Sequence, residues 1–390
     1  MFLKSVILTG GIITGILIGY FIIFYTPLFS LRNEKPFSLL ENFERPRKQV
    51  IGFLPYWLAS KAKTDYSKYI TMLSYFSLTL DDDGKILKLT SPIEEEPGWY
   101  ALRSGKLDKF FKSSKEKNVE LSLVVFNGNQ ESINNLISNP LPHAQNLIRE
   151  TVPIMKEYGF TDLNLDIEST SEASDEARTR FVLFVKEVKK GLQSQQAGTL
   201  TIDISPIDFV KKNLVNPKEV AGFVDRMLLM GYDYHYTGSY VTGPVAPLYG
   251  AGSTAEFDIQ TAIEKAQRIM PKEKIILGMP LYGYEWESIN NSPRSGIIPG
   301  TGLIASNLRV EQLLASCATC SGGFDEEAQE TYIVYKDEKT NTYHQIFYPD
   351  KKSSLAKISF AENNHIGGIA LWALGYEGAT ILEGIADYNK

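Results

Sequence analysis

Eight short apolar runs recur along the chain from about residue 50 onward, and longer stretches of mixed polarity separate them. Most of these runs are continuously apolar rather than alternating, which is typical of parallel strands that are buried on both faces. Amphipathic stretches at residues 177–191, ending on Gly191, and at residues 259–270, before Pro271, predict helices between strands. Alternating strands and helices predict a parallel sheet, and eight strands predict that it closes into a barrel. The runs occupy residues 50–54, 72–80, 120–126, 163–167, 200–204, 226–230, 275–279 and 366–372.

An open, doubly wound sheet is the alternative arrangement of such strands. It would need a glycine-rich phosphate-binding turn after the first strand, where this chain has Pro55 followed by two aromatic residues. The seventh and eighth runs are too far apart for one helix to join them, and residues 331–335 and 342–347 between them are strand-like. We therefore predict an α/β fold, a (β/α)8 TIM barrel over residues 50–390, with a small α+β insertion at about residues 285–348 between strands seven and eight.

Residues 6–25 form an uncharged apolar stretch near the amino terminus. A helix of about 20 residues spans roughly 30 Å, the thickness of the hydrocarbon core of a bilayer. A cleavable signal peptide is the alternative, but its apolar region would be shorter and would end at an A-x-A-like site. We therefore expect residues 1–30 to form a transmembrane anchor and residues 31–49 a polar linker. Cleavage of the segment would instead give a secreted protein.

Charge, histidine and cysteine usage narrow the possible functions. The net charge is −6, and no clustered basic face of the kind that binds nucleic acid is evident. The four histidines are scattered, so the sequence predicts no metal site. Cys317 and Cys320 are the only cysteines, and no second pair lies nearby to complete a zinc site. A local disulfide and a pair of free thiols both remain open.

Polar residues occupy every second position of the fourth run and its end. A strand with this period of two presents all of them on one face, which in a barrel is the interior. The last of them would then lie at the carboxyl-terminal mouth, where barrel enzymes have their active sites. A half-exposed edge strand is the alternative. Carboxyls packed close together raise one another's pKa, as a general acid near neutral pH requires. The four residues are Asp162, Asn164, Asp166 and Glu168.

This segment resembles the D-G-x-D-x-D-x-E signature that glycoside hydrolase family 18 carries on its fourth barrel strand. Other segments are similar to family motifs in the expected order, and together they cover about residues 50 to 385. The last of them ends on Trp372, at the position of the tryptophan that forms the family's sugar platform. The segments are VIGFLPYW at residues 50–57, MGYD at 230–233, GMPLYG at 278–283 and GGIALW at 367–372.

Two departures from the family pattern bear on the substrate. Asn164 stands where the signature has its middle Asp, so one ionisable group is missing from the signature's row of carboxyl groups. In addition, Thr161–Asp162 replace the first Asp-Gly. Residues 125–128 read VFNG, where many chitinases have a Ser-x-Gly-Gly turn. Both departures favour the spore-germination and cell-wall branch of the family over the secreted chitinases.

The resemblance implies substrate-assisted, retaining hydrolysis of β-linked N-acetylglucosamine-containing glycans, such as chitin oligomers or peptidoglycan, without a metal or organic cofactor. Glu168 would be the catalytic acid, Asp166 would stabilise the cationic intermediate, and Tyr232 would orient the substrate's acetamide group. For Phe53 and Tyr56, which belong to the first-strand segment, core packing is an equally open interpretation. Substrate-binding residues would be Asp233, Trp372, Met230, Asn164, Phe53 and Tyr56.

An alternative function is that of a membrane-anchored protein of the same family that binds glycan without cutting it. In either case we expect a monomer whose body lies outside the cytoplasm and whose partner is an N-acetylglucosamine-containing polysaccharide. The outward orientation follows from the enzymatic interpretation, because the charges that flank residues 6–25 do not decide it. The sequence leaves open whether the glycan is chitin, peptidoglycan or an N-glycan, and whether cleavage is internal or terminal.

Overall fold

The computed structural model describes residues 48–169 and 171–388 of the chain. The predicted anchor at residues 6–25 and nearly all of the predicted linker lie outside these residues. Among the helices of the described ranges, none has the length and apolar character that crossing a membrane would require. The membrane anchor therefore stays a prediction from sequence.

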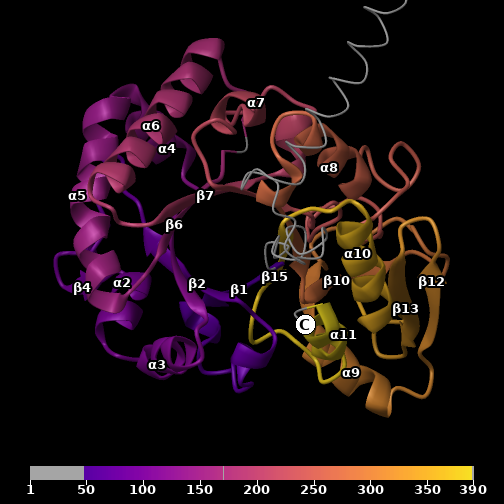
Figure 1. Ribbon diagram of the computed structural model, residues 1–390. Coiled ribbons are helices and arrows are strands. Elements are labelled where there is room, and N and C mark those ends of the chain that lie inside the picture. Colours follow the sequence, from indigo (N-terminus) through magenta and orange to yellow (C-terminus); the bar gives the residue numbers. More distant parts are fainter. Residues whose placement is uncertain (1–47, 170, 389–390) are drawn as a thin grey trace, which may run out of the picture. The chain divides into compact units, whose positions relative to one another are not determined.

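The body is built on a closed barrel of eight parallel strands (Figure 1). Neighbouring strands around the barrel follow the order of the chain, and the last strand pairs with the first. Each of the eight apolar runs forms one of these strands, which confirms the predicted (β/α)8 barrel. The strands are β1 (Gln49–Pro55), β2 (Met72–Thr79), β5 (Glu120–Asn127), β6 (Asp162–Ile167), β7 (Thr199–Ile204), β8 (Arg226–Met230), β9 (Ile275–Pro280) and β15 (Gly368–Trp372).

Helices surround the strands on the outside of the barrel (Figure 1). They are α2 (Pro97–Arg103), α3 (Asp108–Glu116), α4 (Gln130–Ser138), α5 (Pro140–Tyr158), α6 (Asp175–Ser194), α7 (Pro217–Val220), α8 (Ile259–Gln267), α10 (Lys351–Asn363) and α11 (Ile381–Tyr388). Short 3-10 helices and a small hairpin fill the connections: η2 (Tyr56–Leu58), η3 (Tyr66–Lys68), η4 (Pro206–Phe209), η5 (Lys272–Lys274), β3 (Leu89–Ser91) and β4 (Glu94–Glu95).

The predicted end of one helix is wrong. Helix α6 begins after Ser174, whose side chain accepts a hydrogen bond from the Ala177 amide, but it continues through Gly191 to Ser194. A Cβ atom at Gly191 would lie 2.5 Å from Cγ1 of Ile148 on α5. The glycine is therefore used for close packing between α5 and α6, rather than as a helix stop.

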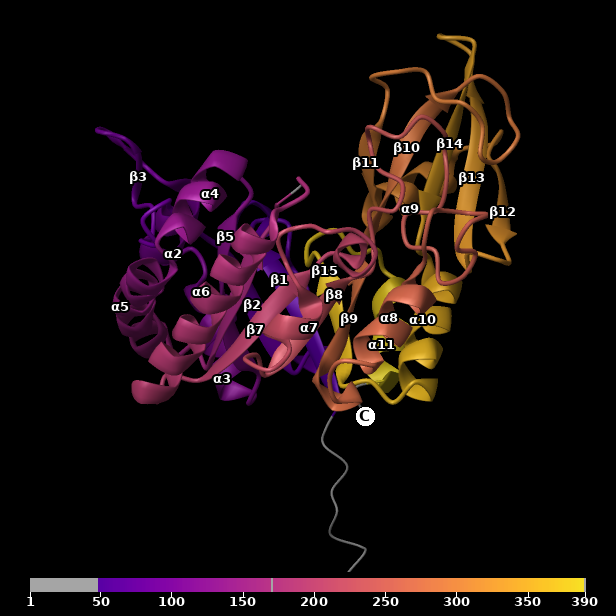
Figure 2. The ribbon, with the colours of Figure 1, turned by 90° about the horizontal axis from the view of Figure 1, so that it is seen from above.

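The predicted insertion between the seventh and eighth strands is a five-stranded antiparallel sheet with one helix. It begins at Tyr282, a few residues before the predicted boundary, and Figure 2 shows it standing to one side of the barrel. The predicted hairpin is confirmed as β13 and β14. A disulfide joins Cys317 to Cys320 between the helix and the next strand. In spatial order the strands are β11 (Leu303–Ser306), β10 (Tyr282–Ser288), β14 (Thr342–Tyr348), β13 (Glu330–Asp337) and β12 (Ser321–Asp325), and the helix is α9 (Asn307–Ser316).

The interior of the barrel is polar at its amino-terminal end. Asp162 is buried there, and its carboxylate lies 3.1 Å from Nη1 of Arg226 on β8. Ser122 Oγ and Thr201 Oγ donate to the same carboxylate at 2.7 and 3.0 Å. These contacts confirm that the alternating polar face of β6 points inward. They also offset part of the cost of burying the charge of Asp162, whose pKa burial still raises above the usual value.

We predict that Gly283→Ala destabilises the protein. Gly283 lies in β10, and a Cβ atom there would approach the backbone oxygen of Phe347 on β14 to 1.9 Å. Because backbone must shift, the free energy of unfolding should fall by about 1–3 kcal/mol or more. Gly222→Ala is the matched control, since nothing lies within 4 Å of the added atom. Equal unfolding midpoints in urea for the two variants would contradict the packing of the insertion described above.

Candidate active site

Acidic and aromatic side chains gather at the carboxyl-terminal mouth of the barrel. They line a cleft of about 410 Å³. The acidic groups come mainly from β6, β7 and the chain after β8, and the aromatic groups from β1, η2, β2, β5, β15 and the chain after β8. The lining residues include Glu96, Asp166, Glu168, Asp203, Asp233, Tyr232, Met230, Phe53, Tyr56, Trp57, Phe76, Phe126 and Trp372.

Glu168 follows the last residue of β6 and is held in place through its backbone. Its amide donates to the carbonyl oxygen of Asn127 on β5 at 2.9 Å. The side chain keeps contact with solvent through the open mouth. The protein atoms packed around it, and then the charge of Asp233, nevertheless raise the pKa of its carboxyl above the usual value. Glu168 therefore holds a proton to higher pH than an ordinary glutamic acid.

Asp166 lies two residues before Glu168 on the same face of β6 and is buried, with 3% of its surface exposed. Its Oδ1 atom has no hydrogen-bond partner among the described residues. Burial raises the pKa of Asp166 well above the usual value, and the charges of Glu168 and Asp203 raise it further. A buried oxygen without a donor at the edge of a cleft can accept a hydrogen bond from a bound ligand.

Asp203 on β7 belongs to the same group, although the sequence analysis did not select it. It is 5% exposed and lines the cleft. Asn164 Nδ2 donates to Asp203 Oδ1 at 3.0 Å. One signal could have found Asp203: residues 199–204 read TLTIDI, so polar and apolar residues alternate there as they do in β6.

Tyr232 and Asp233 follow β8. Burial, and next the charge of Asp203, raise the pKa of Tyr232 well above its usual value, so its hydroxyl stays a neutral donor. Asp233 has a left-handed backbone, with φ at 62°. Its Oδ1 atom accepts from the hydroxyls of Tyr282 at 2.5 Å and Tyr284 at 3.0 Å. Both tyrosines belong to β10, so the insertion fixes the Asp233 side chain. The sequence analysis assigned no role to either tyrosine.

The aromatic part of the cleft is centred on Trp372. Its ring centroid lies 4.6 Å from that of Phe76, 5.8 Å from that of Phe53 and 6.5 Å from that of Trp57, all in edge-on contacts. Trp57 is 45% exposed, which leaves apolar ring surface open at the rim of the cleft. Apolar ring surfaces of this kind stack against sugar rings.

The structure brings most of the predicted site residues together. The three predicted catalytic residues line one cleft with Asp233, Trp372, Met230, Phe53 and Tyr56. Asn164 is the exception, because it is buried in the barrel interior with its amide directed at Asp203 rather than at the cleft. Within the described ranges, no group of three or more His, Cys, Asp or Glu side chains is arranged to hold a metal ion.

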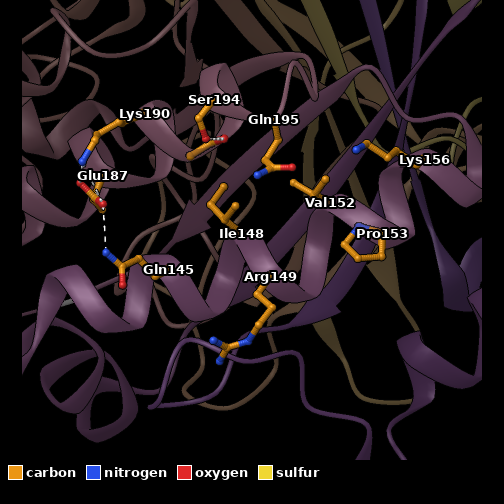
Figure 3. A pocket seen from close by; sticks show the side chains of 11 residues that line it. Gln145, Ile148, Arg149, Val152, Pro153, Lys156, Glu187, Lys190, Ser194 and Gln195 are labelled. Atoms are coloured by element: carbon orange, nitrogen blue, oxygen red, sulfur yellow. Dashed lines mark hydrogen bonds and ion pairs between the residues drawn. The ribbon is translucent and has the colours of Figure 1, made fainter.

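A larger hollow of about 650 Å³ lies on the outside of the barrel, between α5 and α6 (Figure 3). Ile148, Val152 and Pro153 give it an apolar floor. Its charged residues are already engaged in part with one another, since Glu187 accepts from Gln145 and pairs with Lys190. Its carboxyl, Glu187, is engaged by Gln145 and Lys190, and acidic side chains do not converge there as they do at the mouth of the barrel, so the mouth is the candidate active site despite its smaller volume.

A (β/α)8 barrel that gathers carboxylates and aromatic rings at the carboxyl ends of its strands has the architecture of the barrel enzymes. A sequence model of the glycosyl hydrolases family 18 matches residues 49–377. The chain therefore belongs to this family, as the sequence motifs predicted.

Three known proteins show what the chain is similar to. The cortical fragment-lytic enzyme of Bacillus subtilis (strain 168) is 24% identical over 327 residues, which are 81% of this chain and 67% of that protein. The Group IV chitinase of Ostrinia furnacalis has a TM-score of 0.75 at 20% identity, over 88% of this chain and 99% of that one. The spore cortex-lytic enzyme SleL of Bacillus cereus has a TM-score of 0.67 at 20% identity, over 88% and 74%.

These similarities differ in what they establish. The two structural likenesses show a shared fold. The chain spans about half to two thirds of the length of the first curated relatives it matches. The activity of those whole proteins is therefore a basis for a proposal about this chain.

We predict that Asp166→Asn raises the stability of the folded protein at neutral pH. The pKa of Asp166 is raised in the folded protein, whereas in the unfolded chain an aspartic acid has a pKa of about 4. Ionising Asp166 therefore costs more in the folded state, and the folded state loses stability as the pH rises above about 4. The amide removes that cost. Thermal unfolding should show a higher midpoint than wild type at pH 8 and a much smaller difference at pH 4. Asp82→Asn, on the exposed surface, is the control. A pH-independent difference would contradict the burial of this charge.

Proposed function

We propose that this protein is a glycosidase that hydrolyses β-linked N-acetylglucosamine-containing glycans by substrate-assisted retaining catalysis. The observation that carries the proposal is the convergence of Glu168, Asp166 and Tyr232 in one cleft beside the aromatic surface of Trp372. The relatives support the class of substrate, since they are named as cortex-lytic enzymes and chitinases.

The geometry suits a reaction in which the substrate supplies its own nucleophile. Glu168, whose raised pKa lets it keep a proton to higher pH than an ordinary glutamic acid, gives that proton to the glycosidic oxygen as the bond to the leaving sugar breaks. The oxygen of the substrate's 2-acetamido group attacks the anomeric carbon and forms a cyclic cation. Asp166 accepts the acetamide N–H with its unpaired oxygen and stabilises the positive charge. Glu168, now a carboxylate, then takes a proton from the water that opens the ring.

The neighbouring residues hold the sugar and the reacting group. The neutral Tyr232 hydroxyl donates to the acetamide oxygen and orients it for attack. Trp372 lies under the sugar as an apolar floor. Asp233, fixed by two tyrosine hydroxyls, keeps one oxygen free to contact a sugar hydroxyl and a negative charge that raises the pKa of Glu168.

The setting of the enzyme is also a proposal. A polymeric cell-wall or chitin-like substrate requires that the barrel lie outside the cytoplasm. Residues 6–25 are proposed to anchor it there, with residues 31–49 as a tether. We expect the barrel to act as a monomer.

Glu168→Gln should abolish turnover. The amide keeps the shape of the side chain but has no acidic proton to donate, and loss of a general acid lowers the rate by about 100- to 10,000-fold. The measurement is release of fluorophore from an N-acetylglucosamine oligomer. Glu176→Gln, on the exposed first turn of α6, is the control and should keep wild-type activity. Binding without turnover in the wild-type protein would favour the non-catalytic glycan-binding alternative.

Only substrates with a 2-acetamido group at the cleaved sugar should react, because the proposed nucleophile belongs to that group. Matched oligomers of glucose and glucosamine should be essentially inert even where they bind on Trp372. A thiazoline that mimics the cyclised intermediate should inhibit competitively and more tightly than substrate binds. Comparable rates on glucose and N-acetylglucosamine oligomers would show that a protein side chain is the nucleophile.

A further inference from the structure

Asp203 is a buried carboxyl that the reaction described above does not use. It projects into the barrel from β7, next to the strand that carries Asp166 and Glu168. The register pairs Leu165 with Ile202, so the following residues, Asp166 and Asp203, lie side by side on adjacent strands. Both side chains are buried and both line the cleft.

Asn164 connects Asp203 to the β6 motif. Its Nδ2 donates to Asp203 Oδ1 at 3.0 Å, while its own Oδ1 is buried without a partner among the described residues. The amide is therefore oriented with an N–H toward Asp203 even though its oxygen is left unpaired, which is costly for a buried polar atom. Asn164 therefore donates to the carboxylate of Asp203, whereas an aspartate at position 164 would have repelled it.

The surroundings of Asp203 are almost entirely acidic. Two buried carboxyls without a cation between them do not both ionise at low cost, so such a pair keeps a proton. Arg226 of β8 pairs with Asp162 at the amino-terminal end of the barrel interior. The titratable and charged groups around Asp203, from β6, β8 and the connections that follow β7 and β8, are Asp162, Asp166, Glu168, Asp208, Arg226, Tyr232 and Asp233.

We propose that Asp203 is a positioning residue that replaces, from the neighbouring strand, the carboxyl that Asn164 removes from β6. This proposal rests on the proposed function. In it, Asp203 accepts the proton that Asp166 carries in the free enzyme. The proton leaves one Asp166 oxygen and bonds to Oδ2 of Asp203, while Oδ1 keeps the hydrogen bond from Asn164. Asp166 becomes the anion that the cationic intermediate needs, and the number of protons in the pair is unchanged.

The decisive experiment moves the carboxyl from one strand to the other. Asp203→Asn should lower kcat by about 10- to 100-fold, and it should shift the alkaline limb of the pH–rate profile to lower pH. The shift arises because removal of a negative charge lets Asp166 and Glu168 ionise more easily. The double variant Asn164→Asp/Asp203→Asn restores a carboxyl–amide pair with the two groups exchanged. Its kcat should be at least ten-fold higher than that of Asp203→Asn, and its alkaline limb should return toward the wild-type position.

Thr201→Val is the control for a change on the same face of β7 two residues away: it removes one hydroxyl donor to Asp162 but no carboxyl. It should leave the position of the alkaline limb unchanged. A carboxyl 13C NMR titration of Asp166 in the Asp203→Asn variant adds a readout that needs no turnover, and its pKa should fall. Thermal unfolding of each variant separates loss of fold from loss of function.

The outcomes separate this proposal from the proposed function. If wild type hydrolyses the oligomer and Glu168→Gln does not, the function stands. An unchanged pH profile for Asp203→Asn, or a folded double variant without rescue, then overturns the role of Asp203 alone. If wild type shows no hydrolysis, the proposed function fails. The NMR titration still decides whether Asp203 and Asp166 share a proton, and an unchanged Asp166 pKa would overturn that pairing.

Discussion

The burial of several carboxyl groups inside one barrel is the constraint on which the rest of the structure depends. At the amino-terminal end, Asp162 is compensated by Arg226 and by hydroxyl donors. Toward the mouth, Asp203 receives the Asn164 amide and Oδ1 of Asp166 has no partner among the described residues, and burial raises the pKa of both carboxyls well above the usual value. The barrel interior thus has a lower layer, in which Asp162 pairs with Arg226, and an upper layer, in which carboxyl groups face one another without a paired cation among the described residues.

The insertion stabilises the other side of this upper layer. Its strand β10 supplies the two hydroxyls that hold Asp233, and Glu330 of β13 accepts backbone N–H groups of Val245 and Ala246 in the connection after β8. Glu330 is in turn 3.7 Å from Lys357 of α10, and both side chains are fully buried. Removing one member of such a pair leaves an uncompensated buried charge. The insertion is therefore part of the framework of the site.

Patterns within single segments of the sequence predicted the barrel strands. They predicted site residues only where those residues lie in a strand or directly after it. Continuous apolar runs identified all eight barrel strands, and the alternation around Asp166 placed the acid at the mouth. Gly191 misled because its helix-stopping tendency was outweighed by packing against Ile148, a contact distant in sequence. Asp203, Tyr282 and Tyr284 were missed for a related reason. Their roles depend on contacts between distant segments, of Asp203 with Asn164 and of the tyrosines with Asp233; the alternation of residues 199–204 shows that Asp203 faces the interior but not which residue it contacts.

The parallel direction of the barrel strands has a consequence for how the enzyme meets a polymer. Every barrel strand runs toward the mouth, so β1 enters the barrel at the opposite face and delivers Phe53 to the cleft only at its far end. The side chains that would contact a glycan therefore come from the ends of the strands and from the connections that follow them. Substitutions at the beginnings of the strands change the framework of the barrel without touching the substrate.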